Sequence, residues 1–383
     1  MSKLLAQGGF GCVYHPGIPC DNTFKNTKDF VSKLQKKNYA SNNETVIGNK
    51  IKKITNYKKY FRVHQTSCDV ELSSIDKKLL ENCRPIKMDA KIPYMILNLE
   101  YLTNPDFFSI LFDNKKTVKH RYVYILQSYL NIVEGFMFLS NMDIVHFDLK
   151  NENILYDNRN NNFLISDFGI SLDMSEYSLK NVEKYFYIYA PDYYVWSFDI
   201  HLICLLMYSQ GKITLETISD MINLHIDVNP CFELFSQNLK NMYFNKCFMF
   251  GKNYIDIEGE TRDNNIKKLV SGYKTWDNYG VSALYLRILQ LSYKNKIPKS
   301  TFLIEFTKLL LQNLSPDPKD RLSFKDTHSK MITLIKEDLK KDEMVTHIET
   351  DVVKLEKIVL ESKIQTKELK KIQKASGISV LRN

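Results

Sequence analysis

The 383-residue sequence predicts an α+β fold with two lobes, and three features of the chain lead to this prediction. Short apolar runs separated by Gly, Pro and Asn dominate the first hundred residues, which is typical of strands. Apolar residues then recur every three or four positions over long stretches, which is typical of amphipathic helices. The last segment, 336–383, is rich in Lys and Glu and contains no aromatic residue. We therefore expect a small β-rich N-terminal lobe over about 1–102, a large helical lobe over about 103–335, and a helical tail.

In the N-terminal lobe, residues 4–34 read as strands interrupted by a turn, in the order "LLAQGGFGCVYH", "PGIPCDNTFKNT" and "FVSKL". A helix is predicted over 41–55, because Val46, Ile47, Ile51 and Ile54 lie on one side at helical spacing. The runs "YFRVH" (60–64) and "YMILNLEYL" (94–102) are expected to form further strands. The change to helical patterning near 100–105 marks the expected boundary between the lobes.

The helical lobe is expected to begin with a long helix over 118–140, whose apolar residues follow a 3.6-residue period. The same periodicity predicts further helices over 197–210, 215–225, 281–292 and 301–314.

Composition limits the classes of protein. Hydrophobic residues make up 44% and charged residues 25%, which are ordinary values for a globular chain. No apolar run approaches the ~18 residues of a membrane span, and the start of the chain lacks the apolar stretch of a signal peptide. We therefore expect a cytoplasmic protein without a membrane partner.

Charge and cysteine content support the same expectation. The net charge is +9, but the basic residues are scattered, whereas a nucleic-acid site is usually a cluster. No nucleic-acid partner is therefore expected. The seven cysteines include no CxxC pair, which favours free thiols in a reducing compartment.

The segment "VHFDLKNENILYDNRNNNFLISDFG" (145–169) carries the strongest chemical signal. Asp148 and Asn153 lie in a polar segment after the long helix, and a hairpin over the Asn-rich tip is expected to bring Asp167 beside them. Carboxylate and amide oxygens suit Mg²⁺, which usually shares its ligands with substrate phosphates. Asp148 would then be free to orient a hydroxyl nucleophile. The alternative is that these residues only form turns and caps.

This segment resembles the eukaryotic-type protein kinase superfamily. "HFDLKNEN" (146–153) resembles its catalytic loop H-R-D-L-x-x-x-N, and Asp167 begins a match to its D-F-G. The resemblance covers about 1–335 and implies a bilobal kinase domain that uses ATP and Mg²⁺. It implies that Asp148 orients the acceptor hydroxyl, that Lys150 steadies the transferring phosphate, and that Asn153 and Asp167 hold the metal ions.

The same resemblance extends to the N-terminal lobe. "LAQGGFGCV" is similar to the phosphate-binding Gly-rich loop, and "FVSK" is similar to V-A-I-K. Lys33 would therefore contact the α- and β-phosphates, with Glu44 as its helix partner; Lys36 and Lys37 are the rival lysines. "LNLEYL" resembles the interlobe hinge, with Leu99 at the gatekeeper position and the backbone from Glu100 to Leu102 facing adenine. The residues of the Gly-rich loop are Leu5, Ala6, Gln7, Gly8, Gly9, Phe10, Gly11, Cys12 and Val13.

Motifs further along the chain are less regular. "YAPDYY" (189–194) resembles A-P-E, which implies a buried pair between Asp192 and Arg321, and Asp199 is expected to support the catalytic loop. Phe147 replaces the Arg of H-R-D, an Arg that helps to bind a phosphate on the activation segment. Apolar packing of an aromatic segment is expected instead. Tyr185 is expected near the catalytic Asp and Lys.

Taken together, these motifs predict a Ser/Thr protein kinase similar to the divergent kinases of large cytoplasmic DNA viruses, which would place it in the host cytoplasm or the virion. A pseudokinase scaffold and a small-molecule phosphotransferase remain the alternatives. Protein substrates are the expected partners.

The Lys/Glu-rich tail is expected to form a helix over about 343–374 that carries no catalytic residue. Its apolar residues follow 3-4 spacing at Val345, Ile348, Val352, Leu355 and Val359. Packing on the rest of the chain, self-association and a solvated arm are the open alternatives.

Overall fold

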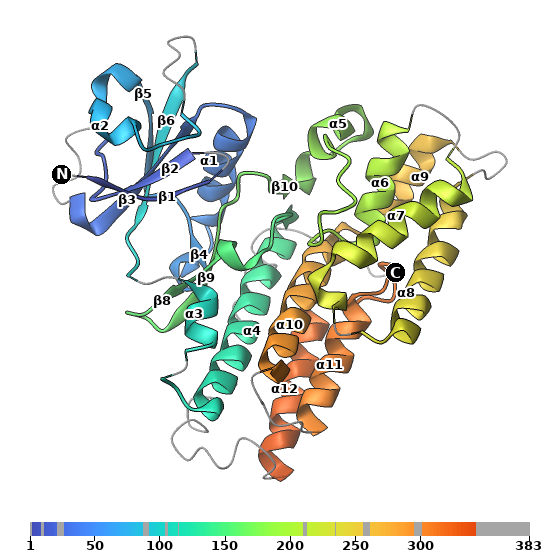
Figure 1. Ribbon diagram of the computed structural model, residues 1–383. Coiled ribbons are helices and arrows are strands. Elements are labelled where there is room, and N and C mark those ends of the chain that lie inside the picture. Colours follow the sequence, from blue (N-terminus) through green and yellow to red (C-terminus); the bar gives the residue numbers. More distant parts are fainter. Residues whose placement is uncertain are drawn as a thin grey trace. The chain divides into compact units, whose positions relative to one another are not determined.

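The structure is a computed structural model (Figure 1) that divides into two compact units. Unit 1 comprises Met1–Phe107 and Glu152–Ser171, and unit 2 comprises Phe108–Asn151 and Leu172–Asn383. The chain therefore leaves unit 1 once and returns to it for a segment of 20 residues, numbered 152–171. The structure describes residues 2–8, 11–20, 27–86, 92–103, 106–113, 115–209, 213–233, 235–255, 261–294 and 301–341.

Unit 1 is built on an antiparallel five-stranded sheet, which contains the strands predicted within 4–34 and at 94–102, whereas its strand β5 was not predicted. β3 lies at the centre and pairs with β6 from Phe30–Glu100 through Lys36–Tyr94. β6 is buried along almost its whole length, which explains its nearly unbroken apolar sequence. In order across the sheet, the strands are β1 (Lys3–Gln7), β2 (Gly11–His15), β3 (Phe30–Lys36), β6 (Tyr94–Glu100) and β5 (Thr66–Val70).

A second, smaller sheet in unit 1 contains the predicted hairpin over the Asn-rich tip. β8 (Ile154–Asp157) pairs with β9 (Asn162–Ser166) in antiparallel register. β4 (Phe61–Arg62) adds to the other side of β9 in parallel. The short helices of unit 1 are α2 (Lys77–Leu80) and α3 (Phe107–Leu111), the latter running across the boundary into unit 2.

Helix α1 (Tyr39–Ile51) is the long helix of unit 1. It begins at a capping box, in which the Asn38 side chain accepts from the Ser41 backbone and the Ser41 side chain accepts from Asn38. The predicted helix over 41–55 is therefore correct in kind, but it ends earlier. Val46 is also 53% exposed, so its predicted place on the buried face is wrong. Gly48 lies there instead, and a Cβ at this position would sit 2.7 Å from Nδ1 of His64.

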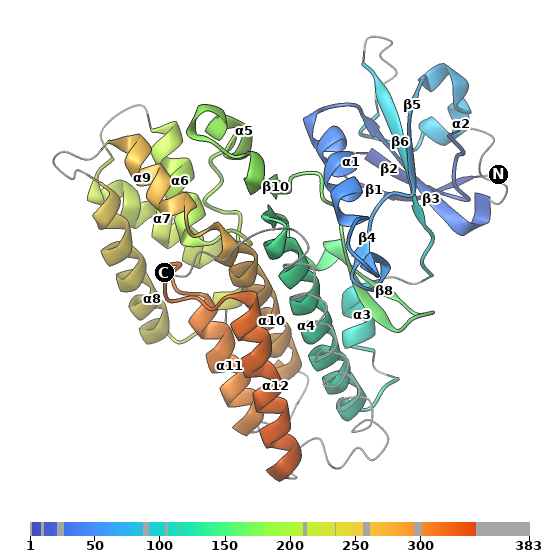
Figure 2. The same cartoon turned by 180° about the vertical axis from the view of Figure 1, so that it is seen from behind.

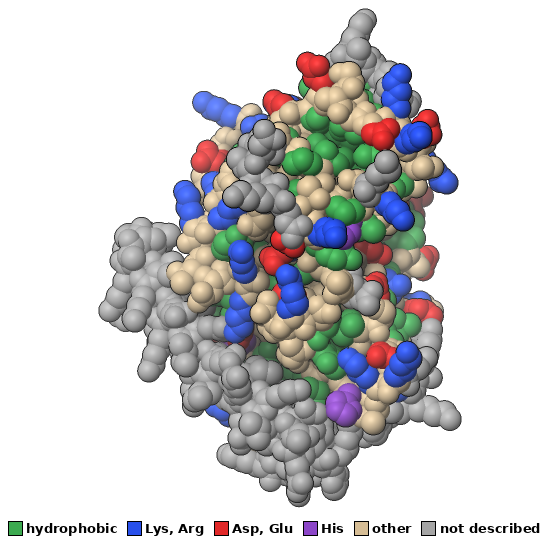
Figure 3. Space-filling model, turned by 90° about the vertical axis from the view of Figure 1, so that its left-hand side faces the viewer, with side chains coloured by type: hydrophobic (Ala, Val, Ile, Leu, Met, Phe, Trp, Pro, Cys, Tyr) green, Lys and Arg blue, Asp and Glu red, His purple; other side chains and the backbone are tan. Residues whose placement is uncertain are grey.

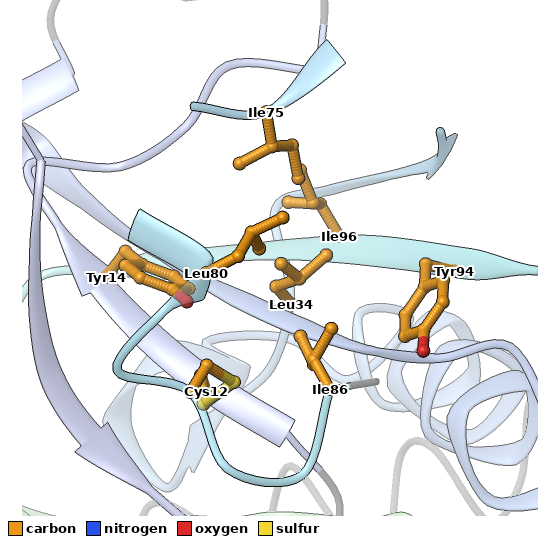
Figure 4. Packing of buried hydrophobic residues seen from close by; sticks show 9 residues of the cluster. Cys12, Tyr14, Leu34, Ile75, Leu80, Ile86, Tyr94 and Ile96 are labelled. Carbon is orange, nitrogen blue, oxygen red and sulfur yellow. A yellow bond between two sulfur atoms is a disulfide. The ribbon is translucent and has the colours of Figure 1, made fainter. Parts of the chain in front are cut away.

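The core of unit 1 contains a disulfide. Figure 4 shows Cys12, Leu34 and Tyr94 within a cluster of buried residues from β2, β3, β6 and the α2 segment. Cys12 is bonded to Cys83 in this cluster, and a second disulfide joins Cys20 to Cys68.

The prediction of free thiols is therefore wrong for these four cysteines. The bonded partners are 71 and 48 residues apart, so no local spacing motif announces them. The other three cysteines, Cys204, Cys231 and Cys247, are free and buried.

Unit 2 is helical. Figures 1 and 2 show α4 beside α10 and α12, and these helices are in contact. A two-stranded ladder joins β7 (Ile144–Val145) to β10 (Leu172–Asp173). The helices are α4 (Val118–Asn141), α5 (Val182–Tyr185), α6 (Phe198–Tyr208), α7 (Leu215–Val228), α8 (Gln237–Gly251), α9 (Arg262–Val270), α10 (Trp276–Lys294), α11 (Thr301–Asn313) and α12 (Phe324–Lys341).

All five helices predicted for this part of the chain are confirmed, with small shifts at their ends. Helices α5, α8, α9 and α12 were not predicted. In α8, Leu239, Met242 and Met249 are exposed, so apolar residues occur on several sides and hide the helical period. Helix α9 is short and mostly polar. Side chains mark the starts of both helices, because Ser236 and Thr261 accept hydrogen bonds from backbone N–H groups of the first turn.

The predicted tail helix over 343–374 lies outside the described residues, although α12 continues past 335 to Lys341. Within the part of the chain that the structure describes, no helix combines the length and apolarity needed to cross a membrane. On the face drawn in Figure 3, Lys and Arg side chains are scattered among Asp and Glu side chains.

Candidate active site

The loop that carries Asp148 follows β7 in unit 2 and is held from its backbone. Asp277, in the first turn of α10, accepts hydrogen bonds from the N–H groups of His146 at 2.7 Å and Phe147 at 3.1 Å. Burial raises the pKa of Asp277. Phe147 has a φ of 68°, a conformation that is uncommon for a bulky side chain. The two hydrogen bonds to Asp277 therefore stabilise a strained turn immediately before Asp148.

The carboxylate of Asp148 is engaged on both oxygens and is only 5% exposed. Its Oδ2 accepts from Nζ of Lys150 at 3.0 Å. Its Oδ1 accepts from the hydroxyl of Tyr193. Lys150 lies where the resemblance expects it, whereas nothing in the sequence motifs pointed to Tyr193.

Phe147 packs in an aromatic cluster. Its ring centroid lies 4.5 Å from that of Trp196, and the centroids of Phe186 and Trp276 are farther away, at 6.1 and 6.2 Å. Nε1 of Trp196 also donates to the carbonyl of Phe147 at 2.9 Å. Because Phe186 and Trp196 belong to the segment after D-F-G, this cluster connects that segment to the Asp148 loop. Apolar contacts therefore hold the segment in place, as expected from its aromatic composition.

The predicted ion pair of Arg321 with Asp192 is wrong. Arg321 pairs with Asp199 at 2.5 Å, and both side chains are fully buried. Asp199 also accepts from Nε1 of Trp276 at 2.7 Å, whereas Asp192 is exposed. Asp199 lies on α6, and Arg321 lies far along the chain from it. Tertiary packing therefore decides which carboxylate pairs with Arg321.

A further expectation needs correction. The acid that supports the catalytic loop is Asp277 and not Asp199. The missing W-S-x-G after Asp199 and the short spacing between Asp192 and Asp199 were signals against the assignment. The hydroxyl of Tyr185 donates to the carbonyl of Asp173 at 2.8 Å.

In unit 1, Lys33 on β3 joins two carboxylates. Its Nζ lies 2.9 Å from Oε2 of Glu44 on α1 and 3.0 Å from Oδ1 of Asp167. Burial by itself would lower the pKa of Lys33, but the two carboxylates more than offset it and raise that pKa. Lys33 therefore stays charged at physiological pH. The rival Lys37 pairs with Asp69 at the surface instead.

Asn153 and Asp167 are neighbours at the ends of paired strands. Ile154 lies opposite Ile165, so Asn153 comes opposite Ser166, whose hydroxyl donates to the Asn153 carbonyl at 3.1 Å. One carboxylate and one amide oxygen are a donor set that fits Mg²⁺, since this ion takes its remaining ligands from water and substrate phosphates. The local β8–β9 pairing is what brings these two residues together.

The backbone after Asp167 is held by α1. The side-chain amide of Asn43 donates to the carbonyls of Gly169 at 3.1 Å and Ser171 at 2.8 Å. Phe168 is buried, and its ring lies 6.1 Å from that of Phe61. Sequence motifs did not identify Asn43, although it directly precedes Glu44 on the same helix.

The described residues of the Gly-rich segment belong to the end of β1, to Gly8 and to the start of β2. The N–H of Gly8 donates to the carbonyl of Gly11 at 3.0 Å, and a Cβ on Gly8 would meet no atom within 4 Å. A Cβ on Gly11 would lie 2.2 Å from the Leu34 carbonyl, so the strand pairing requires glycine there. Ala6 pairs with Val13 and Gln7 with Cys12. Gly9 and Phe10 lie outside the described residues.

The expected hinge follows β6. Leu99 and Leu102 are buried. The carbonyl of Glu100 accepts two hydrogen bonds from the Arg62 guanidinium, at 2.9 and 3.0 Å. The N–H of Tyr101 donates to the Asp29 carbonyl at 2.9 Å. The carbonyl of Glu100 and the N–H of Tyr101 are therefore engaged within unit 1.

The residues described so far form two groups. Lys33, Glu44, Asn153 and Asp167 belong to unit 1, and Asp148, Lys150 and Tyr193 belong to unit 2. A β-sheet region with a lysine–carboxylate cluster and a helical region with an engaged loop aspartate are features of ATP-dependent phosphoryl-transfer enzymes.

Comparison with known proteins agrees with this class. The family model described as the protein kinase domain matches residues 2–333, so the chain belongs to the protein kinase family. Members of this family transfer a phosphoryl group and in general use ATP and Mg²⁺. A search of curated proteins finds no match.

Proposed function

We propose that the chain is an active protein kinase that transfers the γ-phosphoryl group of ATP to Ser or Thr hydroxyls of protein substrates. The cluster of Lys33 with Glu44 and Asp167 is the observation that carries this proposal. A partly buried lysine held between two carboxylates keeps its charge and its position, and phosphoryl transfer depends mainly on such positioning and charge.

Each group has a role in the proposed reaction. Lys33 contacts the α- and β-phosphates, and the backbone of the Gly-rich segment lies against the phosphates. Asn153 and Asp167 hold Mg²⁺, which neutralises phosphate charge when it is bound. Asp148 orients the acceptor hydroxyl and accepts its proton, and Lys150 steadies the transferring phosphate.

Two alternative functions remain open, a pseudokinase scaffold and a small-molecule phosphotransferase. A scaffold does not need the catalytic groups, and here Lys33, Asp148, Asn153 and Asp167 are all retained. The family favours protein substrates over small molecules. The Asn- and Lys-rich sequence and the Asp148-Leu149-Lys150 motif support a divergent Ser/Thr kinase of a large cytoplasmic DNA virus, acting in the host cytoplasm or the virion.

The test is transfer of radiolabelled phosphate from ATP to generic protein substrates, followed by phosphoamino-acid analysis. We expect Asp148→Asn to lower the rate by about 10²–10⁴-fold, because a positioned acid–base group contributes about that much. Lys37→Met is the control for Lys33→Met, since Lys37 lies on the surface beside Asp69. A wild-type chain that binds ATP but transfers no phosphate would support the scaffold alternative instead.

A further inference from the structure

The Gly-rich segment begins on a strand that has little support from the rest of unit 1. This strand, β1, forms one edge of the five-stranded sheet, and four of its five residues are exposed. Its pairing with β2 is irregular between Leu4 and Ala6. Glycine also loses more conformational freedom on ordering than any other residue. The segment therefore needs contacts from outside β1 and β2 to keep a single conformation.

A disulfide and a hydrogen bond supply such contacts, and both come from the same place in the chain. Gln7 on β1 lies opposite Cys12 on β2, and residues 8–11 connect them in sequence. Cys12 is bonded to Cys83. The backbone N–H of the next residue, Arg84, donates to Oε1 of Gln7 at 3.1 Å. Two consecutive residues thus hold the Gly-rich segment on both sides of residues 8–11.

The segment that carries Cys83 is itself anchored in the core of unit 1. Figure 4 shows its side chains Leu80 and Ile86 in the same cluster as Cys12. The hydroxyl of Tyr14, on β2, donates to the carbonyl of Leu79 at 2.9 Å. The bond from Cys12 therefore leads to a part of the chain that is held by packing. The buried members of this cluster from segment 72–86 are Ile75, Leu80, Cys83 and Ile86.

The second disulfide of unit 1 is placed differently. Cys68 lies on β5, which forms the edge of the sheet opposite to β1. Its partner Cys20 lies after the end of β2 and receives a contact from the side-chain amide of Asn98 at 3.5 Å. This bond is a matched control for the first, because it crosslinks the same unit away from residues 8–11.

We propose that the Cys12–Cys83 disulfide, together with the hydrogen bond from Arg84 to Gln7, positions the Gly-rich segment for nucleotide phosphates, so that nucleotide affinity depends on the redox state of this bond. The proposal rests on the proposed function, in which the backbone of this segment lies against the phosphates. A dithiol reductant breaks the S–S bond by giving two electrons and two protons to the cysteine sulfurs, and it becomes a disulfide itself. The released segment must then be ordered when the nucleotide binds, and this lost preorganisation lowers the affinity.

The experiment compares the Kd for Mg²⁺–ATP, measured by calorimetry, of the full-length wild-type, Cys83→Ser and Cys68→Ser chains. We expect Cys83→Ser to raise the Kd about tenfold, which corresponds to the cost of ordering the backbone of about one residue. Cys68→Ser should leave the Kd unchanged. Each variant loses one disulfide, so urea unfolding should show losses of stability of the same order. A general loss of stability would therefore not explain a difference in affinity.

Reduction and a third variant provide independent measurements. A dithiol should raise the Kd of the wild-type chain to that of Cys83→Ser, and it should not change the Kd of Cys83→Ser. Gln7→Met keeps both disulfides and removes only the acceptor of the Arg84 N–H. We expect it to raise the Kd about threefold, since a hydrogen bond typically contributes about that much. Because Gln7 is exposed, this variant decides the proposal even where Cys83→Ser does not fold.

The outcomes separate this proposal from the kinase function. Equal changes of the Kd in Cys83→Ser and Cys68→Ser, or an unchanged Kd in Gln7→Met, would overturn the positioning role. An unchanged wild-type Kd after a thiol count confirms reduction would overturn the redox dependence. A wild-type chain that binds ATP but transfers no phosphate to a generic protein would contradict the kinase function, while the comparison of Kd values would still decide the positioning role. A wild-type chain that binds no ATP would contradict both.

Discussion

Asn43 on α1 donates its side-chain amide to the backbone carbonyl of Ser171 at 2.8 Å. The same nitrogen lies 3.1 Å from the carbonyl of Gly169 and 3.4 Å from that of Phe168. One side chain thus links the helix that carries Glu44 to three of the four residues that follow Asp167. Asn43 therefore connects the helix of Glu44 to the backbone next to Asp167, and these two residues are the partners of Lys33.

Replacing Asn43 should disturb both stability and transfer. Asn43→Leu keeps the approximate volume but leaves backbone carbonyls without their donor, which costs about 1–3 kcal/mol. We expect the free energy of unfolding in urea to fall by that amount and kcat to fall about tenfold, because Asp167 is held less well. Asn42→Leu is the control, since Asn42 is exposed on the same helix. Equal effects of the two substitutions would contradict the role of Asn43.

The buried pair of Asp199 with Arg321 predicts a large loss of stability. Asp199→Ala leaves the Arg321 charge buried without its carboxylate, and breaking such a pair costs about 3–5 kcal/mol. Asp192→Ala should change stability by less than about 0.5 kcal/mol, because Asp192 is exposed. Denaturant unfolding of the two variants measures the difference. A larger loss of stability for Asp192→Ala than for Asp199→Ala would instead support the pairing of Arg321 with Asp192 that the sequence motif suggested.

The two disulfides predict a specific thiol count. Of seven cysteines, four are bonded, so the unfolded, unreduced protein should react with a thiol reagent at three positions. A count of seven would contradict both bonds. Reduction should lower the free energy of unfolding by about 2–4 kcal/mol per bond, because the crosslinks restrict the unfolded chain. A Cys12→Ser/Cys83→Ser variant should lose only one of the two contributions.

Stability should fall as the pH decreases, because of two buried histidines. The rings of His201 and His225 lie 4.9 Å apart, and burial lowers the pKa of His201 to about 3 and that of His225 well below its usual value. The unfolded chain binds protons at both positions below about pH 6.5, whereas in the folded chain His201 stays neutral until near pH 3 and His225 stays neutral well below pH 6.5. Stability is therefore highest above pH 6.5 and falls as the pH decreases below 6.5, down to about pH 3 for the His201 contribution.

The expected slope is about 1.4 kcal/mol per pH unit for each histidine. Urea unfolding at pH 7.5, 6.5, 5.5 and 4.5 measures it. His201→Gln and His225→Gln should flatten the dependence, while His120→Gln, at an exposed position, should not. A stability that is constant over this range would show that the two rings are not held neutral.

The local features of the fold and site could be predicted from the sequence. The β8–β9 hairpin lies within 13 residues of chain, and its register brings Asn153 and Asp167 together through strand pairing alone. Lys33 could be recognised as a candidate site residue from its place in β3, and Glu44 could be recognised as its candidate partner from its place near the start of α1. In each case the residues are near one another in sequence, or their element has a clear hydrophobic period.

Only the tertiary structure decided which distant residues meet. The partner of Arg321 lies 122 residues away at Asp199, and Asp277 reaches the Asp148 loop across 131 residues. The bond of Cys12 to Cys83 and the contact of Tyr193 with Asp148 are of the same kind. Spacing along the chain specifies which residues share a turn, a strand or a helix face. It does not specify which buried charge, thiol or hydroxyl lies opposite, because that depends on how the helices and sheets pack around one another.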